Sequence, residues 1–207
     1  MLNRRFITFE GGEGSGKSTQ IKILKNKLSK RHKVIITREP GGTKEAELIR
    51  NLLVKGRSNK WSGTTEALLN FTARKDHVDK VILPNLKNGK WVLCDRFSDS
   101  TIAYQVYGRN VDKEIIKSLN KSLINNLKPK ITFLFDLDPK IGLGRSRKRG
   151  NNELRYENMS LSYHKKIRNA YLDIARKNKK RIKIIDASLD KDSISEIIWS
   201  FIQKELT

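Results

Sequence analysis

The residues most able to do chemistry lie in a glycine-rich stretch at residues 11–18, which reads GGEGSGKS. It fits the pattern G-x-x-x-x-G-K-[ST] and lies between an apolar run at residues 6–9 and a helical pattern that starts at Ser18. Glycines let a backbone wrap closely around a phosphate, with N–H groups pointing inward at the positive end of the following helix. Lys17 is expected to reach the β- and γ-phosphates, and the Ser18 hydroxyl to bind Mg²⁺. The alternative is a glycine-rich turn that binds nothing; the strand before it and the helix after it make that reading less favourable.

The elements that must position this loop alternate between short β-branched runs and longer helical patterns. The alternation predicts a parallel sheet with helices on both faces, the three-layer α/β architecture of the P-loop NTPase fold. Because 207 residues suit one domain with a real core, the whole chain, 1–207, is interpreted as a single domain. Five strands are expected, at residues 6–10, 34–37, 91–95, 130–136 and 181–186. Helices are expected from residue 18 to about 30, after Thr43, from 64 to about 86, and at 112–125, 159–178 and 194–201.

Polar residues gather where these strands end. In an open α/β sheet the carboxyl ends of the strands meet at one crevice, so we expect these residues to share a site. Asp95, after four apolar residues, has the setting of the carboxylate that holds Mg²⁺ through water in phosphate-loop enzymes. Its other interpretation, as a cap of the next helix, is compatible with this one. The residues at the strand ends are Glu10, Arg38, Glu39, Asp95, Arg96, Asp136 and Asp138.

Residues from about 140 to 157 carry closely spaced arginines between glycines. Gly142 and Gly144 are expected to interrupt the helix here, and the flanking glycines predict a mobile lid over a polyphosphate. The alternative is a solvated basic surface. A lid that closes excludes water and favours transfer to an acceptor over hydrolysis. The arginines are Arg145 and Arg149, which share a helix face, and Arg147, which does not.

The arginines of the whole chain are more numerous than one nucleotide needs, which predicts two phosphorylated ligands facing each other. They are spread over the sequence as Arg38, Arg50, Arg74, Arg96 and the group at residues 145–155.

Charge and composition limit the remaining function classes. Lys and Arg number 44 against 22 Asp and Glu, a formal charge of +22. Because the lysines are scattered and no RNA-binding signature is present, we attribute most of the excess to compositional bias and expect no specific nucleic acid as partner.

One cysteine, Cys94, excludes an internal disulfide. No apolar run has the length of a signal peptide or a membrane span, so a cytoplasmic protein without a membrane partner is expected.

Six motifs together resemble the bacterial type of thymidylate kinase, and the likeness runs almost end to end. The resemblance implies transfer of a phosphoryl group from ATP to dTMP, with Mg²⁺, giving dTDP and ADP for dTTP synthesis, usually by a homodimer. The alternatives are a kinase for another nucleoside monophosphate or deoxynucleoside on this scaffold and, from another class, a nucleotide-dependent switch or nucleic-acid-binding module. The motifs are FEGGEGSGKSTQ at 9–20, TREPGGT at 37–43, FTAR at 71–74, DRFSDSTIAYQ at 95–105, RSRKRG at 145–150 and RYE at 155–157.

The resemblance also implies individual roles. Phe71 would stack on thymine and Arg74 would donate to a base carbonyl; Glu13 would meet the 3′-hydroxyl of the sugar, and Tyr104 would crowd the 2′ position against ribose. Lid arginines, Arg149 above all, would stabilise the transferring phosphoryl group, because Gly14 and Ser15 leave the loop without an arginine. Glu157 would help to position the lid or the substrate.

The resulting site assignment has four parts. The residues assigned to ATP are Gly11, Gly12, Glu13, Gly14, Ser15, Gly16, Lys17, Ser18, Thr19, Arg145 and Arg149. Those assigned to dTMP are Glu13, Arg38, Glu39, Arg50, Phe71, Arg74, Arg96, Ser100, Thr101, Tyr104 and Gln105. The catalytic residues are Lys17, Arg149, Arg96, Asp95 and Glu13, and the metal is assigned to Ser18 and, through water, Asp95.

Two positions depart from the family's pattern. Phe97 stands where the family often has Tyr or His, and Leu154 where an acidic or polar residue usually precedes the second lid arginine. These departures bear on a contact within the closed lid and not on the reaction class.

Overall fold

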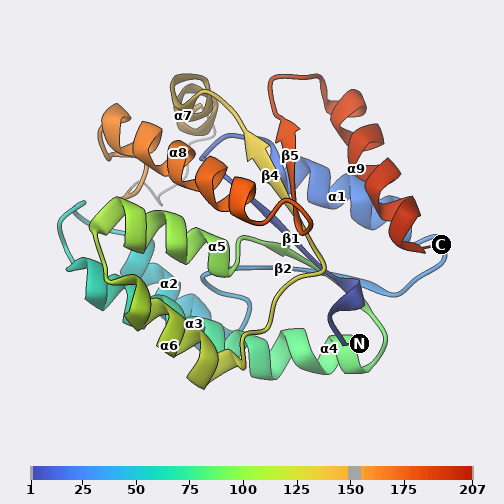
Figure 1. Ribbon diagram of the computed structural model, residues 1–207, viewed down its shortest axis with the longest axis horizontal. Helices are drawn as coiled ribbons and strands as arrows, with labels where there is room; N and C mark the ends of the chain where they lie inside the picture. Colours follow the sequence, from blue (N-terminus) through green and yellow to red (C-terminus); the bar gives the residue numbers. More distant parts are fainter. Residues whose placement is uncertain (1, 149–154, 207) are drawn as a thin grey trace.

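The computed structural model describes residues 2–148 and 155–206 and contains the expected parallel sheet. Its strands pair in the order β2-β3-β1-β4-β5, and every pair is parallel (Figure 1). β1 is therefore central, and the loop after it leaves from the middle of the sheet. The strands are β1 (Phe6–Gly11), β2 (Val34–Arg38), β3 (Trp91–Asp95), β4 (Ile131–Asp136) and β5 (Ile182–Asp186).

Helices connect the strands, and the predicted positions are confirmed to within a few residues. Thr43 caps α2 as expected, since its side chain accepts a hydrogen bond from the N–H of Ala46. The α-helices are α1 (Lys17–Leu28), α2 (Lys44–Val54), α3 (Gly63–His77), α4 (Leu83–Lys87), α5 (Ser98–Thr101), α6 (Lys113–Ile124), α7 (Pro139–Arg147), α8 (Leu161–Lys177) and α9 (Lys191–Leu206). A 3₁₀ turn, η1 (Leu2–Arg5), precedes β1, and two π-helical segments are η2 (Val78–Ile82) and η3 (Ile102–Tyr107).

The three central strands of the sheet, β1, β3 and β4, are buried on both faces, which explains why they are apolar runs, whereas the edge strands β2 and β5 are partly exposed. All six residues of β1 are buried. Successive side chains of a strand point to opposite faces, so Phe9 packs with Leu24 of α1 and Ile198 of α9, while Phe6 packs with Ile82 on the other side. α8 and η3 complete that second face around Leu134 and Ile182. The expected three-layer architecture is confirmed (Figure 1).

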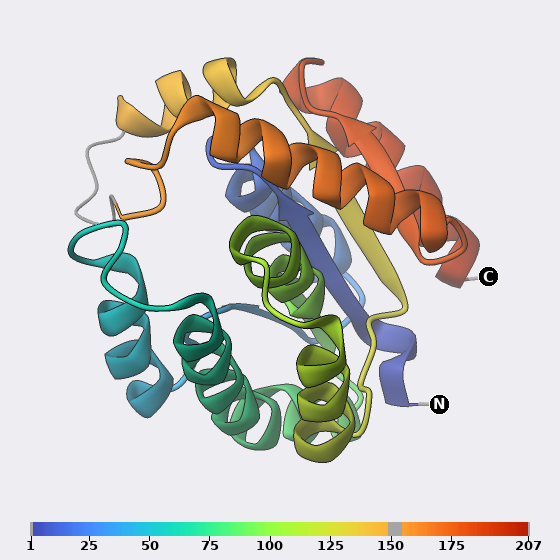
Figure 2. The same cartoon turned by 60° about the vertical axis from the view of Figure 1, so that its left-hand side comes forward.

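The helix predicted from residue 64 to about 86 is continuous but not uniform. It begins as α3 after Ser62, whose side chain accepts from the N–H of Thr65, and widens into the π-helical η2 before α4. Pro84, near the start of α4, has no N–H to donate to the carbonyl four residues earlier, which accounts for an irregular turn at this point. α2, α3 and α6 lie side by side along one flank (Figure 2).

The interruption predicted at Gly142 and Gly144 is wrong, because α7 runs through both glycines. The helix begins after Asp138, whose side chain accepts from the N–H of Lys140, and has Pro139 in its first turn. Glycine costs a helix about 1 kcal/mol relative to alanine, and packing of the helix against other parts of the protein outweighs this.

Candidate active site

The glycine-rich loop joins β1 to α1 in the geometry of a phosphate cradle. Gly11, Gly14 and Gly16 have φ of 136°, 66° and 91°, which side chains rarely adopt. The Nζ of Lys17 folds back over the loop and donates to the carbonyls of Gly12 and Gly11 at 2.8 and 3.1 Å. Burial lowers the pKa of Lys17 to about 8, although Asp95 and other carboxylates nearby act to raise it. The ammonium group of Lys17 therefore lies beside the loop N–H groups that would bind an anion.

α7 packs directly on this loop, backbone against backbone. A Cβ added to Gly14 would lie 2.0 Å from the carbonyl oxygen of Gly142, and a Cβ added to Gly142 would lie 2.3 Å from the carbonyl oxygen of Glu13. Both distances are far inside van der Waals contact, so both positions need glycine. This contact is why Gly142 occupies the interior of a helix.

We expect Gly142→Ala to lower both the melting temperature and kcat, because the added methyl group must push α7 away from the loop or the loop away from its phosphates. Gly144→Ala, on the same helix, is the matched control, since a Cβ there meets no atom of residues 2–148 or 155–206 within 4 Å. The control should keep the wild-type rate and be stabilised by up to about 1 kcal/mol. Thermal unfolding and steady-state rates check both variants, and equal effects of the two would contradict the packing argument.

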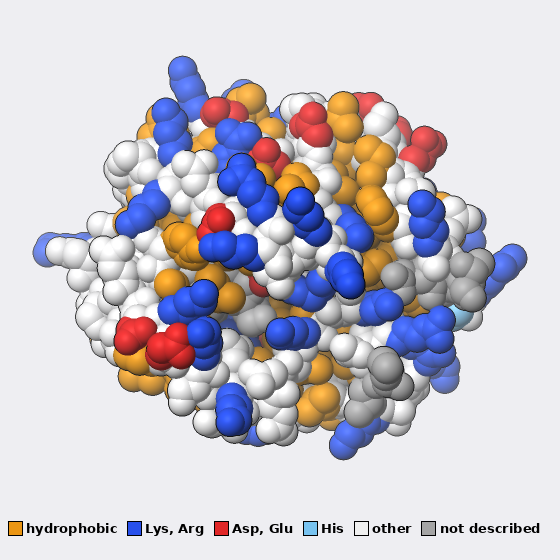
Figure 3. All heavy atoms as spheres, in the orientation of Figure 1, with side chains coloured by type: hydrophobic (Ala, Val, Ile, Leu, Met, Phe, Trp, Pro, Cys, Tyr) orange, Lys and Arg blue, Asp and Glu red, His pale blue; other side chains and the backbone are white. Residues whose placement is uncertain are grey.

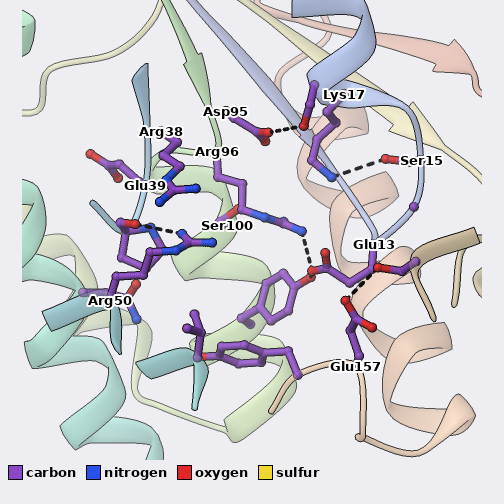
Figure 4. A pocket seen from close by; sticks show the side chains of 18 of the residues that line it. Glu13, Ser15, Lys17, Arg38, Glu39, Arg50, Asp95, Arg96, Ser100 and Glu157 are labelled. Atoms are coloured by element: carbon purple, nitrogen blue, oxygen red, sulfur yellow. Dashed lines mark hydrogen bonds and ion pairs between the residues drawn. The ribbon is translucent and has the colours of Figure 1, made fainter. Parts of the chain in front are cut away.

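A cavity of about 280 Å³ opens beside the loop, between the carboxyl ends of β1, β2 and β3 (Figure 4). The structure brings most of the predicted residues to its wall: Glu13, Gly14, Ser15, Gly16, Lys17, Ser18, Arg38, Glu39, Arg50, Asp95, Arg96, Ser100, Thr101, Tyr104, Gln105 and Glu157. Five further residues line it that the sequence did not assign: Pro40, Val54, Asn70, Ser146 and Tyr156. Pro40, Ser146 and Tyr156 lie inside the quoted motifs and Asn70 directly precedes one, so only their positions in the chain offered a signal.

Several assigned residues lie away from the cavity wall. Gly11 and Gly12 lie on the other side of the loop, Thr19 is exposed on α1, and Arg145 is exposed on α7. Arg149 lies outside the described residues, as does Leu154.

Arg96 and Glu13 form an ion pair in the wall of the cavity. Arg96 has φ of 67°, a left-handed conformation that is uncommon for a side-chain-bearing residue and turns the chain at the end of β3. Its Nη2 donates to Glu13 Oε1 at 2.6 Å, and its guanidinium lies 5.3 Å from the centre of the Tyr104 ring (Figure 4). Burial alone would raise the pKa of Glu13, but the charges of Arg96 and Lys17 outweigh it and bring that pKa to about 2. Glu13 is therefore a carboxylate held by an arginine at the junction of loop and cavity.

Ser18 and Asp95 lie together at the start of α1. Ser18 Oγ donates to Asp95 Oδ2 at 3.1 Å, while Asp95 Oδ1 is buried and has no hydrogen-bond partner among the described residues. Buried carboxylate oxygens are rarely unpaired, and a second oxygen reserved for a hydrated cation accounts for this one. The pair therefore fits the metal site that the sequence predicts.

The capping role considered for Asp95 belongs to Glu10 instead. Glu10 Oε1 accepts from the N–H of Phe97 at 2.8 Å and of Ser100 at 3.3 Å, and Oε2 accepts from the Ser100 hydroxyl at 2.6 Å. Burial, together with the charge of Asp99, raises the pKa of Glu10 to about 7. Glu10 thus fixes the start of α5, which carries Ser100 and Thr101 to the cavity.

Phe71 and Arg74, both on α3, are buried behind the cavity wall rather than in it. Arg74 Nε donates to Glu39 Oε2 at 2.7 Å and Nη2 to Thr101 Oγ1 at 2.9 Å, and its guanidinium lies 5.0 Å from the centre of the Phe71 ring. The remaining nitrogen, Nη1, is buried without a partner among the described residues. His77 holds the other oxygen of Glu39 at 3.1 Å. Arg74 is therefore fixed in place with one donor unused.

The other arginines differ in accessibility. Arg38 pairs with Glu47 at 2.9 Å, and Arg50 donates to the carbonyl of Pro40 at 2.8 Å, both at the edge of the cavity. Arg155, counted among the arginines for phosphate, is fully buried and is bound to three backbone carbonyls and Glu66. The interpretation of Arg155 as a phosphate ligand is wrong, because its donors are used within the protein.

Phe97, one of the two departures from the family's pattern, lies in the core. Its ring meets the edge of Phe6 with centroids 5.0 Å apart, and it does not line the cavity. This substitution therefore changes packing rather than the cavity wall.

A glycine loop with its lysine between the central strand and α1, and a carboxylate on the adjacent strand, define a P-loop nucleotide-binding protein; the arginine-lined cavity beside the loop makes room for a second anionic ligand. A sequence profile described as "Thymidylate kinase" matches residues 9–198. The chain belongs to the thymidylate kinase family.

Individual relatives agree with this assignment. The thymidylate kinase of Afipia carboxidovorans is 46% identical over 205 residues, covering 98% of this chain and 90% of the relative. That of Magnetococcus marinus is 46% identical over 199 residues, covering 96% and 95%. The crystal structure of thymidylate kinase from Ehrlichia chaffeensis superposes with a TM-score of 0.78 at 35% identity, covering 97% of this chain and 99% of that one.

Proposed function

We propose that the protein transfers the γ-phosphoryl group of ATP to dTMP, giving dTDP and ADP. The single observation that carries this is the Arg96–Glu13 pair, which links the phosphate loop to a second, arginine-lined cavity. Phosphoryl transfer needs two anionic reactants held in line and their charge neutralised, and little else from the protein. One loop and one adjoining cavity meet this need, and membership of the thymidylate kinase family names the acceptor.

The loop and the arginines divide the work. The N–H groups of residues 12–18 and Lys17 bind the phosphates of ATP. Arg96, with Arg38 and Arg50 at the cavity edge, binds the phosphate of dTMP and holds it facing the γ-phosphate. Glu13, anchored by Arg96, accepts a hydrogen bond from the 3′-hydroxyl of the sugar. The two reactants are then oriented by one connected set of side chains.

The base is bound on the α3 side of the cavity. Phe71 provides an aromatic face, and Arg74 Nη1 is the unused donor that a base carbonyl would accept from. Because Phe71 and Arg74 lie behind Glu39 and Thr101, we propose that this wall shifts when the base enters. Tyr104, whose hydroxyl donates to Glu13 at 3.3 Å, leaves little space at the 2′ position of the sugar.

We propose Mg²⁺ as the cofactor, held by the Ser18 hydroxyl and, through water, by Asp95. When bound it supplies positive charge to the β- and γ-phosphates. A chelator should therefore stop turnover, and added Mg²⁺ should restore it; turnover that survives the chelator contradicts the assignment.

A coupled assay of ADP release tests the acceptor. We expect rapid turnover with ATP and dTMP, and much less with dCMP, dGMP or AMP in place of dTMP. No turnover that depends on dTMP, or equal turnover with all four, would overturn the proposal.

Residues about 140–157 are proposed as the lid of this single domain, with Arg149 as its catalytic arginine. Arg149→Ala should lower kcat by about 10³-fold or more and change the affinity for dTMP little, because its charge acts on the transferring group. Arg147→Ala, expected on the other helix face, is the control and should keep most of the rate. A variant whose KM for dTMP rises at unchanged kcat would move Arg149 to the substrate side.

We further propose a homodimer formed through the flank of α2, α3 and α6. Exposed apolar side chains on these helices support it: Leu48 and Leu52 on α2, Leu68 on α3 and Ile115 on α6. Sedimentation should give twice the chain mass of 23.9 kDa, and a monomer contradicts the proposal.

We also propose that the protein works in the cytoplasm and has no specific nucleic acid as partner. Lys and Arg side chains are spread over the face in Figure 3 rather than gathered in one patch. This distribution agrees with a compositional origin of the basic charge. Within the residues that the structure describes, no helix combines the length and the apolar character needed to cross a membrane. Binding of DNA with a steep dependence on salt would contradict this view.

A further inference from the structure

Glu66, a buried carboxylate outside the cavity wall, connects several parts of the acceptor site. It lies on α3 and is fully buried. Its Oε1 accepts from Arg109 at 3.0 Å and from Arg155, and its Oε2 accepts from Gln105 Nε2 at 3.1 Å and from the Tyr156 hydroxyl at 3.4 Å. Gln105 and Tyr156 both line the cavity. Glu66 thus faces two arginines with one oxygen and two cavity residues with the other.

This arrangement fixes the orientation of the Gln105 amide. A side-chain amide has a donor end and an acceptor end, and a carboxylate oxygen can only accept. Gln105 must therefore turn its NH₂ group toward Glu66, which leaves the carbonyl Oε1 as the end on the other side of the amide. A glutamine that is only 2% exposed and has no freedom to flip offers a ligand a defined pattern.

The hydrogen-bonding pattern offered to a ligand combines an acceptor, the carbonyl oxygen of the Gln105 amide, with a donor, the guanidinium of Arg74. Thr101 and Gln105 are four residues apart along α5 and η3, so they lie on one side of this helical segment. Arg74 donates to Thr101 from Nη2, while its Nη1 has no partner among the residues that the structure describes. The complement of this pattern is an imide, which has an N–H next to a carbonyl. The thymine ring has that group at N3 and C4, whereas cytosine reverses both, with an acceptor at N3 and an amine at C4.

We propose that Glu66 is a specificity-determining positioning residue, which holds the Gln105 amide so that its carbonyl oxygen accepts from the imide N–H of the base. The inference rests on the proposed function, since it concerns the nucleotide in the acceptor cavity. Glu66 would touch no substrate and would act only through Gln105.

The test compares the dissociation constants of dTMP and dCMP, by titration calorimetry for dTMP and by its displacement for dCMP. Glu66→Gln should lower the ratio of the dCMP constant to the dTMP constant by about tenfold or more, because a side chain that can donate lets Gln105 flip. Gln105→Met, similar in shape but without the amide, should lower it similarly. Ile198→Ala, at a core position of α9 on the opposite face of the sheet, is the control for general destabilisation and should keep the wild-type ratio. The ratio cancels any loss of folded protein.

Each outcome decides the matter. An unchanged ratio in folded Glu66→Gln overturns the inference, and so does an unchanged ratio in Gln105→Met. A lower ratio for Gln105→Met alone, with Glu66→Gln folded and unchanged, also overturns it, because Gln105 would then recognise the base without Glu66. If Glu66→Gln does not fold, an unchanged ratio in Gln105→Met still overturns the inference. Failure of the wild-type protein to bind dTMP would instead overturn the proposed function.

Discussion

Lys17→Ala is expected to lower kcat by about 10³-fold or more while the chain stays folded. Lys17 is the only side chain of the loop that carries a positive charge to the phosphates, and removing one such group from a phosphoryl-transfer site typically costs this much. Its hydrogen bonds in the structure are to the loop's own carbonyls, which water can replace. Burial lowers the pKa of Lys17 to about 8, because the charged amine is held away from water. Removing this side chain therefore also removes a desolvation cost from the folded state.

Steady-state rates and thermal unfolding of Lys17→Ala check this expectation. Lys22→Ala is the matched control, because Lys22 is an exposed lysine on the same helix, α1. The control should keep the wild-type rate and melting temperature. A nearly normal rate for Lys17→Ala would refute the role of Lys17, and an unfolded variant would assign Lys17 to stability instead.

Arg96→Met is expected to have an effect of similar size, about 10³-fold in kcat/KM for dTMP. Methionine keeps the length of the stem but removes the charge that binds Glu13 and faces the cavity. The loss affects both reactants, because Arg96 would hold the acceptor phosphate and also anchors the loop residue Glu13. An effect confined to KM would reduce Arg96 to a binding residue.

Arg96→Met should also change how the free energy of unfolding depends on pH. In the wild-type protein the pKa of Glu13 is lowered to about 2, so its pairing stabilises the fold fully above pH 4.5 and is lost as pH falls toward 2. Without Arg96 the largest of the charges that lower this pKa is gone, so the contribution is smaller. The difference in the free energy of unfolding between the two proteins should therefore narrow as pH falls below 4.5, measured by chemical denaturation. A difference that is constant from pH 7 to pH 3 would contradict the charge pairing.

Local pattern was sufficient for the loop and the strands, because each depends on residues adjacent in sequence. Gly11 to Ser18 is one contiguous signal, and the central strands β1, β3 and β4 are buried on both faces, which makes them apolar runs. Asp95 could be assigned for the same reason, as the first polar residue after such a run. Its relation to Ser18, 77 positions away, follows from the parallel pairing of β1 with β3.

Residues that act through distant partners could not be assigned in this way. Arg155 follows a basic run, which predicts that it acts with those arginines, yet its partners lie about 90 to 100 positions earlier in the chain, at Leu53, Arg57, Ser58 and Glu66. Gly142 reads as a helix breaker because its neighbour, the carbonyl of Glu13, is invisible to local periodicity. Glu66 has no local signal at all, since a charged residue on a helix ordinarily faces solvent.

The central claim is that one loop and one cavity bring the γ-phosphate of ATP to dTMP rather than to water. Incubating the wild-type protein with ATP labelled in the γ-phosphate, Mg²⁺ and dTMP, and separating the products, tests it directly. We predict labelled dTDP in a one-to-one ratio with ADP and almost no labelled inorganic phosphate. ADP accompanied by labelled phosphate, with no labelled dTDP, would contradict the account.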